Sequence, residues 1–75
     1  MKITWEDPGW GRFMTGWCNR RIVASIRCSE NGLYWPEVYI GPNTTLRRMS
    51  NPFNDIGSAK RWVARWHARL QEFGA

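Results

Sequence analysis

The most regular alternation of apolar and polar residues runs through RRIVASIRC, residues 20–28. Successive side chains of a β-strand point to opposite faces of its sheet, so a period of two predicts a strand with one apolar face. The residues expected on the core face are Ile22, Ala24, Ile26 and Cys28. Those expected on the opposite face are Arg21, Val23, Ser25 and Arg27.

A second strand is predicted before this one and a third after it. Residues 10–18, WGRFMTGWC, are rich in aromatics, and Gly11 and Gly16 indicate a bulge or a close backbone approach. Asn31 and Gly32 predict a type I′ hairpin turn, because both residue types tolerate a positive φ.

The strand expected after that turn is LYWPEVYIG, residues 33–41. Its core face is expected to contain Tyr34, Val38 and Ile40, and its opposite face Trp35, Glu37 and Tyr39. Pro36 has no backbone N–H, so it requires an edge position or a local break in the ladder.

Two further segments have weaker patterns. Ile3 and Trp5 precede the turn signal DPG at residues 7–9 and predict a short leading strand or arm. Residues 44–50, TTLRRMS, fit either a fourth strand or an ordered loop.

A C-terminal helix is the clearest helical pattern in the chain. Asn54, Asp55 or Ser58 can cap its N-terminus. At about 100° per residue, one apolar stripe contains Ala59, Trp62, Val63, Trp66, Leu70 and Phe73. We expect Trp66 in the core and Trp62 at its rim, with Arg61, Arg65 and Arg69 forming a second stripe beside them. Lys60 and His67 fall on the other flank, where His67 is expected to face solvent.

These elements predict a single α+β domain over residues 1–75. We expect an antiparallel meander of three or four strands with one C-terminal helix packed on one face. A chain of 75 residues has little surface to bury, and its 6 Trp, 3 Phe and 2 Tyr compensate because aromatic side chains bury large areas.

The charge of the chain predicts an anionic partner. The formal net charge is +5, and most of the cations are arginine, which suits bidentate contacts to phosphate or carboxylate. The candidate partner-binding residues fall into three groups: Arg61, Arg65 and Arg69 with Trp62 on the helix; Arg20, Arg21 and Arg27 with Trp35 and Tyr39 on the outer sheet face; and Arg47 with Arg48. Each group can equally be a solvated charged face that keeps the protein in solution.

The sequence contains no pattern typical of catalysis or metal binding. His67 is the sole histidine, the acidic residues are scattered singly, and no glycine-rich phosphate loop is present. Cys18 and Cys28 are too few for a disulfide framework or a zinc site, so we expect two reduced thiols. We therefore expect a protein without enzymatic activity, cofactor, metal or membrane partner. The N-terminal residues do not resemble a signal peptide or anchor, which favours the cytoplasm.

About half of the chain resembles a known DNA-binding arrangement. The order IVASI, VYIG and FNDIGSAKRWVARW is similar to the strands and helix of ethylene-response-factor and integrase arm-type DNA-binding domains. In that family the sheet enters the major groove. The resemblance implies that Arg21, Val23, Arg27, Trp35 and Tyr39 face bases and phosphates.

The overall profile resembles a second class. A short, basic, cysteine-poor chain without an active site is similar to phage-encoded inhibitors of bacterial defence, including anti-CRISPR proteins. This resemblance implies stoichiometric occlusion of a host protein or nucleoprotein complex. Direct binding of DNA or RNA is the first alternative, and an accessory subunit of a phage or ribonucleoprotein particle is the second.

Overall fold

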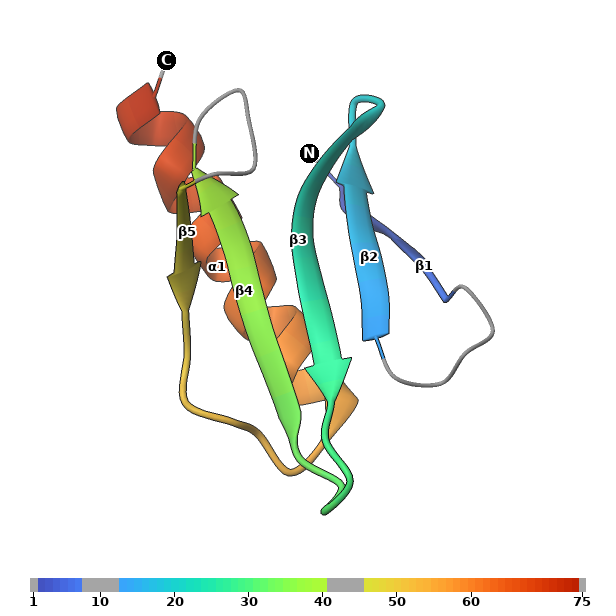
Figure 1. Cartoon of the computed structure of the whole chain (residues 1–75). Coiled ribbons are helices and arrows are strands. Elements are labelled where there is room, and N and C mark those ends of the chain that lie inside the picture. Colours follow the sequence, from blue (N-terminus) through green and yellow to red (C-terminus); the bar gives the residue numbers. More distant parts are fainter. Residues whose placement is uncertain (1, 8–12, 41–45, 75) are drawn as a thin grey trace.

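A five-stranded antiparallel sheet and one helix form an α+β fold in two layers (Figure 1). The computed structural model describes residues 2–7, 13–40 and 46–74, and the side chains of all of these except 46–47 and 71–74. The elements are β1 (Thr4–Glu6), β2 (Phe13–Cys18), β3 (Arg21–Cys28), β4 (Tyr34–Ile40), β5 (Leu46–Met49) and α1 (Ile56–Gly74). Their order in the sheet is their order in the chain, which confirms the predicted meander.

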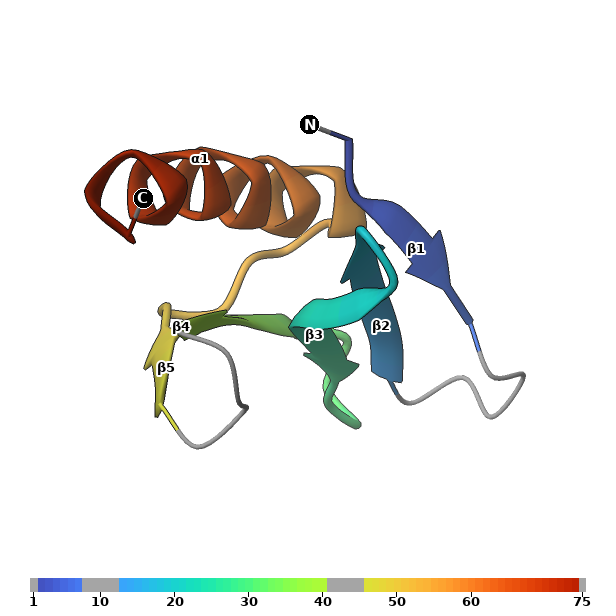
Figure 2. The same ribbon diagram turned by 90° about the horizontal axis from the view of Figure 1, so that it is seen from above.

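The strand count is higher than predicted because both weak segments pair with the sheet. The leading segment forms β1 and the segment after β4 forms β5. Residues 10–12 of the predicted strand over 10–18, Gly11 included, lie outside the described residues. Figure 2 shows that α1 covers one face of the sheet and that no other described element covers the opposite face.

A register shift in the β2–β3 ladder changes which residues of β3 face the core. Gly16 pairs with Ala24, whereas Trp17 pairs with Ile22, so Val23 is the extra residue. An extra residue reverses the alternation of side chains on one side of the bulge. Val23 therefore packs against the core and Ile22 is 40% exposed, so the predicted placement of both was wrong.

Gly16 also permits the close approach that the sequence indicated. A Cβ at this position would lie 3.1 Å from Cγ2 of Ile3 and 3.1 Å from Cζ3 of Trp5. The side chains of the leading segment therefore cover the Gly16 backbone and reach the core cluster.

The structure has a tight turn that was not predicted, and the predicted hairpin turn differs in its type. Asn19 (φ 53°) and Arg20 (φ 65°) form the two-residue left-handed turn between β2 and β3. In the next hairpin only Gly32 has a positive φ, of 80°, and Ser29 pairs with Leu33 through a 2.8 Å hydrogen bond from N to O. The hairpin lies where it was predicted, but its loop has three residues rather than the two of a type I′ turn.

Arg20 gives a testable prediction, because a side chain in the left-handed region costs about 1 kcal/mol. We expect Arg20→Gly to stabilise the protein by roughly 0.5 kcal/mol once the greater freedom of unfolded glycine is included. The melting temperature should rise by about 2–4 °C. Arg21→Gly, one residue further into β3, is the matched control and should lower the melting temperature; a fall with both variants would contradict the interpretation.

Pro36 lies at a break in the β4–β5 ladder, as its missing N–H requires. β5 ends at Met49, which pairs with Glu37, and the Ser50 N–H donates to the Pro36 carbonyl at 3.3 Å. Tyr34 and Phe53 then exchange two backbone hydrogen bonds of 2.9 Å. Pro36 thus needs no partner for its nitrogen.

The buried core lies between α1 and strands β3 and β4. Ala24, Val38, Ala59 and Val63 are 0% exposed and Ile26 is 1% exposed. Cys18 is buried, Cys28 is half-buried, and both are free thiols, as predicted.

The structure confirms Trp62 at the rim of the core and corrects the prediction for Trp66. Trp62 packs against the buried cluster, whereas Trp66 is only half-buried and lies outside it. The C-terminal part of α1 runs toward the β5 side of the sheet, where fewer strands lie beneath it (Figures 1 and 2). The predicted core position of Phe73 falls on a side chain outside the described set.

Asp55 is the helix N-cap, one of the three residues proposed for this role. Its carboxylate accepts hydrogen bonds from the Ser58 hydroxyl at 2.7 Å and from the Ser58 N–H at 2.9 Å. These hydrogen bonds, with the Arg61 charge as a smaller cause, hold the pKa of Asp55 below its usual value.

Candidate binding surfaces

Two guanidinium groups from different elements converge on the indole of Trp66. Cζ of Arg48, on β5, lies 3.9 Å from the ring centroid, and Cζ of Arg69, on α1, lies 5.2 Å from it. Arg48 pairs with buried Val38, so the register directs it to the helix side of the sheet. We call Arg48, Trp62, Trp66 and Arg69 the Trp66 cluster; the rings of its two tryptophans lie 6.2 Å apart.

This arrangement suits an anionic ligand. Cation–π contact holds a guanidinium by its face and leaves its N–H groups at the edge, where phosphate or carboxylate oxygens can accept from them. Arg48 and Arg69 are both exposed. The cluster thus brings together Arg69, from the predicted helix stripe, and Arg48, from the predicted pair at residues 47 and 48.

The predicted stripe of Arg61, Arg65 and Arg69 is present on the exposed side of α1, but the structure divides it. Arg69 belongs to the Trp66 cluster, whereas Arg61 donates to the Ser58 hydroxyl at 3.0 Å near the start of the helix. Arg65 lies between them and is exposed. Residues 56–70 include no Asp or Glu, and the acidic residues of this region are Asp55, at the start of the helix, and Glu72, in its last turn.

A hollow of about 660 Å³ lies between the leading segment and α1. Its lining residues are Lys2, Ile3, Trp5, Lys60, Arg61, Ala64, His67 and Ala68. Nζ of Lys60 lies 5.8 Å from the centroid of the Trp5 ring. The lysines extend the basic surface toward β1.

The prediction that His67 faces solvent was wrong. It is half-buried, and its Nε2 is shielded from solvent without a hydrogen-bond partner among the described residues. Burial lowers the pKa of His67, because desolvation disfavours the imidazolium. The lowered pKa favours the neutral form of His67 on this surface.

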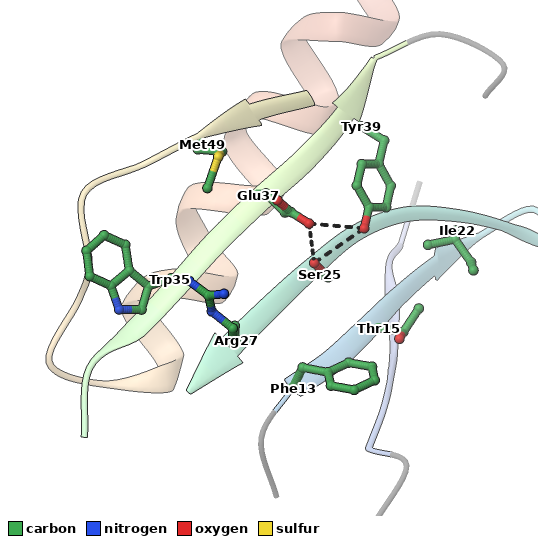
Figure 3. Close-up of a pocket in the computed structure, with 9 residues that line it drawn as sticks. All are labelled: Phe13, Thr15, Ile22, Ser25, Arg27, Trp35, Glu37, Tyr39 and Met49. Carbon is green, nitrogen blue, oxygen red and sulfur yellow. Dashed lines mark hydrogen bonds between the residues drawn. The ribbon is translucent and has the colours of Figure 1, made fainter. Parts of the chain in front are cut away.

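The uncovered side of the sheet forms a second surface, which we call the open sheet face. It surrounds a hollow of about 360 Å³ (Figure 3). Its residues are Phe13, Thr15, Ile22, Ser25, Arg27, Trp35, Glu37, Tyr39 and Met49. Phe13 is 39% exposed, Ile22 40% and Met49 60%.

A hydrogen-bonded group of three side chains fixes the centre of the open sheet face. Oε1 of Glu37 accepts from the Ser25 hydroxyl at 2.8 Å and from the Tyr39 hydroxyl at 3.2 Å (Figure 3). The Tyr39 hydroxyl also lies 3.4 Å from Oγ of Ser25. The carboxylate and the phenol ring are therefore held in defined positions on a surface that also contains Arg27, Thr15 and several apolar side chains.

The structure thus distributes the predicted binding residues over two surfaces. Arg27, Trp35 and Tyr39 share the open sheet face, as expected. Arg21 pairs with buried Cys18, and the pleat places it on the helix side at the end of the sheet. The side chain of Arg47 lies outside the described set.

Sequence reasoning missed three apolar residues of the open sheet face, namely Phe13, Ile22 and Met49. Ile22 was assigned to the core because the alternation was continued through Val23. Gly16 was the available signal: a bulge at that glycine adds a residue to one strand, and an extra residue in β3 moves Ile22 to the outer face.

The described residues offer no site for metal chemistry. Over residues 2–7, 13–40 and 46–74, no three His, Cys, Asp or Glu side chains lie close enough together to hold an ion. In that same part of the chain, no helix combines the length and apolarity needed to cross a membrane.

Comparison with known proteins gives no match to a family model, a curated protein or a solved structure.

Proposed function

We propose that this protein is a small, non-catalytic binding protein that occludes an anionic surface of a nucleoprotein complex. Its contact surface is the basic helix layer, defined by Arg48, Lys60, Arg61, Arg65 and Arg69 around Trp62 and Trp66. The observation that carries the proposal is the convergence of Arg48 and Arg69 on Trp66. Phage-encoded inhibitors such as anti-CRISPR proteins, which work in the cytoplasm of a bacterial host, are the class that this mode of action fits.

Arginine side chains that are already held in place by an indole are well suited to bind phosphate. A free arginine side chain loses rotamer freedom when it binds, whereas one already packed on an indole loses less. These two groups, together with exposed Arg65 on the part of α1 that contains no Asp or Glu (residues 56–70), attract phosphate oxygens at long range and bind them at short range.

Direct nucleic-acid binding through the same layer is the second candidate. Arginines next to aromatic rings are typical of surfaces that bind the phosphate backbone. Reading of the major groove by the sheet has less support, because the open sheet face combines Arg27 with the Glu37 carboxylate and several apolar side chains.

The test compares Arg48→Glu with Arg69→Glu, made together, against the wild type. We expect the double variant to lose binding to its nucleoprotein target on the order of 100-fold, since two charge-assisted contacts become repulsive. Capture of complexes from bacterial lysate measures this loss, and gel shifts of duplex and single-stranded DNA at two salt concentrations measure direct binding. Arg20→Glu with Arg21→Glu has the same net charge and should bind as the wild type.

The outcomes separate the two candidates. Capture of a nucleoprotein complex with weak binding of free DNA supports occlusion. Tight, salt-sensitive binding of free DNA supports the second candidate, with a salt dependence shallower by about two counterions in the double variant. Wild-type binding by the double variant in both assays contradicts a role for the basic helix layer.

A further inference from the structure

The hollow between the leading segment and α1, which we call the β1–α1 hollow, combines an apolar wall with positive charge. Its volume of about 660 Å³ falls in the range of about 300–1,000 Å³ that is typical of small-ligand pockets. Ile3 and Trp5 supply apolar surface from the leading segment, and Ala64 and Ala68, one helical turn apart, supply it from α1. The small alanine side chains keep this space open, because a longer side chain at either position would occupy it.

Two lysines supply most of the charge in the β1–α1 hollow. Lys60 is half-buried, and its Nζ lies 5.8 Å from the centroid of the Trp5 ring. Lys2 is exposed, and no Asp or Glu is among the lining residues. Glu6 pairs with Thr15, which lines the open sheet face, so the alternation of β1 directs Glu6 away from the hollow. The hollow therefore favours an anionic ligand.

A ligand with a flat aromatic body fits the β1–α1 hollow better than an acyl chain does. Ala64 and Ala68 are exposed, so the hollow opens to solvent and does not enclose its occupant. An acyl chain gains most where apolar surface surrounds it, whereas an aromatic ring gains from a single apolar wall and from contact with an indole. A nucleobase joined to a phosphate combines this flat body with the negative charge that the lysines attract.

The β1–α1 hollow is continuous with the basic helix layer. Arg61 lines the hollow and is also the first arginine of the helix stripe. At about 100° per residue, Arg61 falls between Ala64 and Arg65 around the helix, and successive arginines of the stripe rise by about 6 Å. A nucleic-acid strand with one base in the hollow can therefore place its next phosphates along Arg61, Arg65 and Arg69.

We infer that the β1–α1 hollow binds the base of one unpaired nucleotide of a nucleic-acid strand, with the phosphate of that nucleotide on Lys60 and Lys2. A base within a duplex is stacked and paired, so only an unpaired base can enter. The inference rests on the proposed function and deepens it, because it makes single-stranded nucleic acid the anionic surface that the basic helix layer contacts.

Strands with and without bases test the inference. The probes are an unlabelled oligothymidylate and an abasic strand of the same length, which keeps the phosphates. We expect the wild-type protein to bind the oligothymidylate on the order of 10-fold more tightly, because packing of a base on an aromatic ring contributes on that scale. Calorimetry measures both affinities. The oligothymidylate, but not the abasic strand, should also shift the NMR resonance of the Trp5 indole N–H, which the Trp5→Phe variant identifies.

A variant of Ala64 fills the β1–α1 hollow without a change of charge. Ala64 is exposed on α1 and leucine is a good helix former, so Ala64→Leu should fold normally, as circular dichroism would verify. We expect this variant to bind the two strands with similar affinities. Ala64→Ser is the matched control, because it keeps the space open, and it should retain the wild-type preference for the strand with bases.

The two proposals fail in different measurements. Arg48→Glu with Arg69→Glu should lower the affinity for both strands and keep the preference for bases, because its hollow is intact. Four results would overturn the hollow as a base site and leave occlusion by the basic helix layer standing. They are wild-type protein that binds the two strands equally or not at all, a folded Ala64→Leu variant that keeps the preference, a Trp5 resonance that the oligothymidylate does not shift, and tighter binding of thymidine monophosphate than of the oligothymidylate.

Discussion

Replacement of Ile26 by alanine should lower the melting temperature by about 10–30 °C. Ile26 is 1% exposed and packs in the cluster formed with Ala24, Ala59 and Val63. Truncation of a buried isoleucine typically removes about 2–5 kcal/mol, through lost burial and the cavity left behind. Each kcal/mol shifts the midpoint of a domain of this size by about 4–8 °C. Thermal unfolding followed by circular dichroism measures the effect.

Ile22 is the matched control, because it is the same residue type four positions earlier on the same strand. It is 40% exposed on the open sheet face, so we expect Ile22→Ala to change stability by less than about 1 kcal/mol. Equal destabilisation by the two variants would place both side chains in the core and contradict the bulge at Val23.

The Trp66→Ala variant should lose both stability and binding. The indole is half-buried, so we expect a loss of about 2 kcal/mol, below the 3–5 kcal/mol typical of a fully buried aromatic. Arg48 and Arg69 would also lose the ring that positions them, and binding through the basic helix layer should weaken on the order of 10-fold. Denaturant unfolding and the capture assay measure the two effects.

Trp66→Phe separates the two roles of this residue. Phenylalanine keeps an aromatic face for the guanidinium groups, so binding should recover most of its strength even where some stability is lost. Trp35→Ala, on the open sheet face, serves as the control for loss of an indole and should leave binding through the helix layer unchanged. If Trp66→Ala bound as tightly as the wild type, the ring would have no part in positioning the arginines.

The regular parts of the fold were predictable because they depend on local periodicity. Alternation in β3 and β4, the proline break and the helical spacing of Ala59 and Val63 follow from the sequence alone. The face of the sheet on which Ile22 lies does not follow from the sequence, because the pairing of β3 with β2 determines it. A bulge changes which residue faces inward without changing the composition of the strand.

The binding surface was predictable only in part, for a similar reason. The basic character of α1 can be read from the sequence, and so can the position of Trp35 and Tyr39 on one face. The Trp66 cluster could not be predicted, because Arg48 reaches Trp66 from a strand 18 positions earlier in the chain. That contact requires the β4–β5 register and the diagonal course of the helix, neither of which has a local signal.

The chain-order pairing of the strands has a consequence for how the protein forms during synthesis. Each strand pairs with its immediate predecessor, so the contacts of the sheet have low sequence separation and can form rapidly as the chain lengthens. The helix that covers Ala24, Ile26 and Val38 is made only after all five strands. Until then both faces of the nascent sheet are bare. Translation speed through residues 56–74 should therefore influence how much of the protein escapes aggregation.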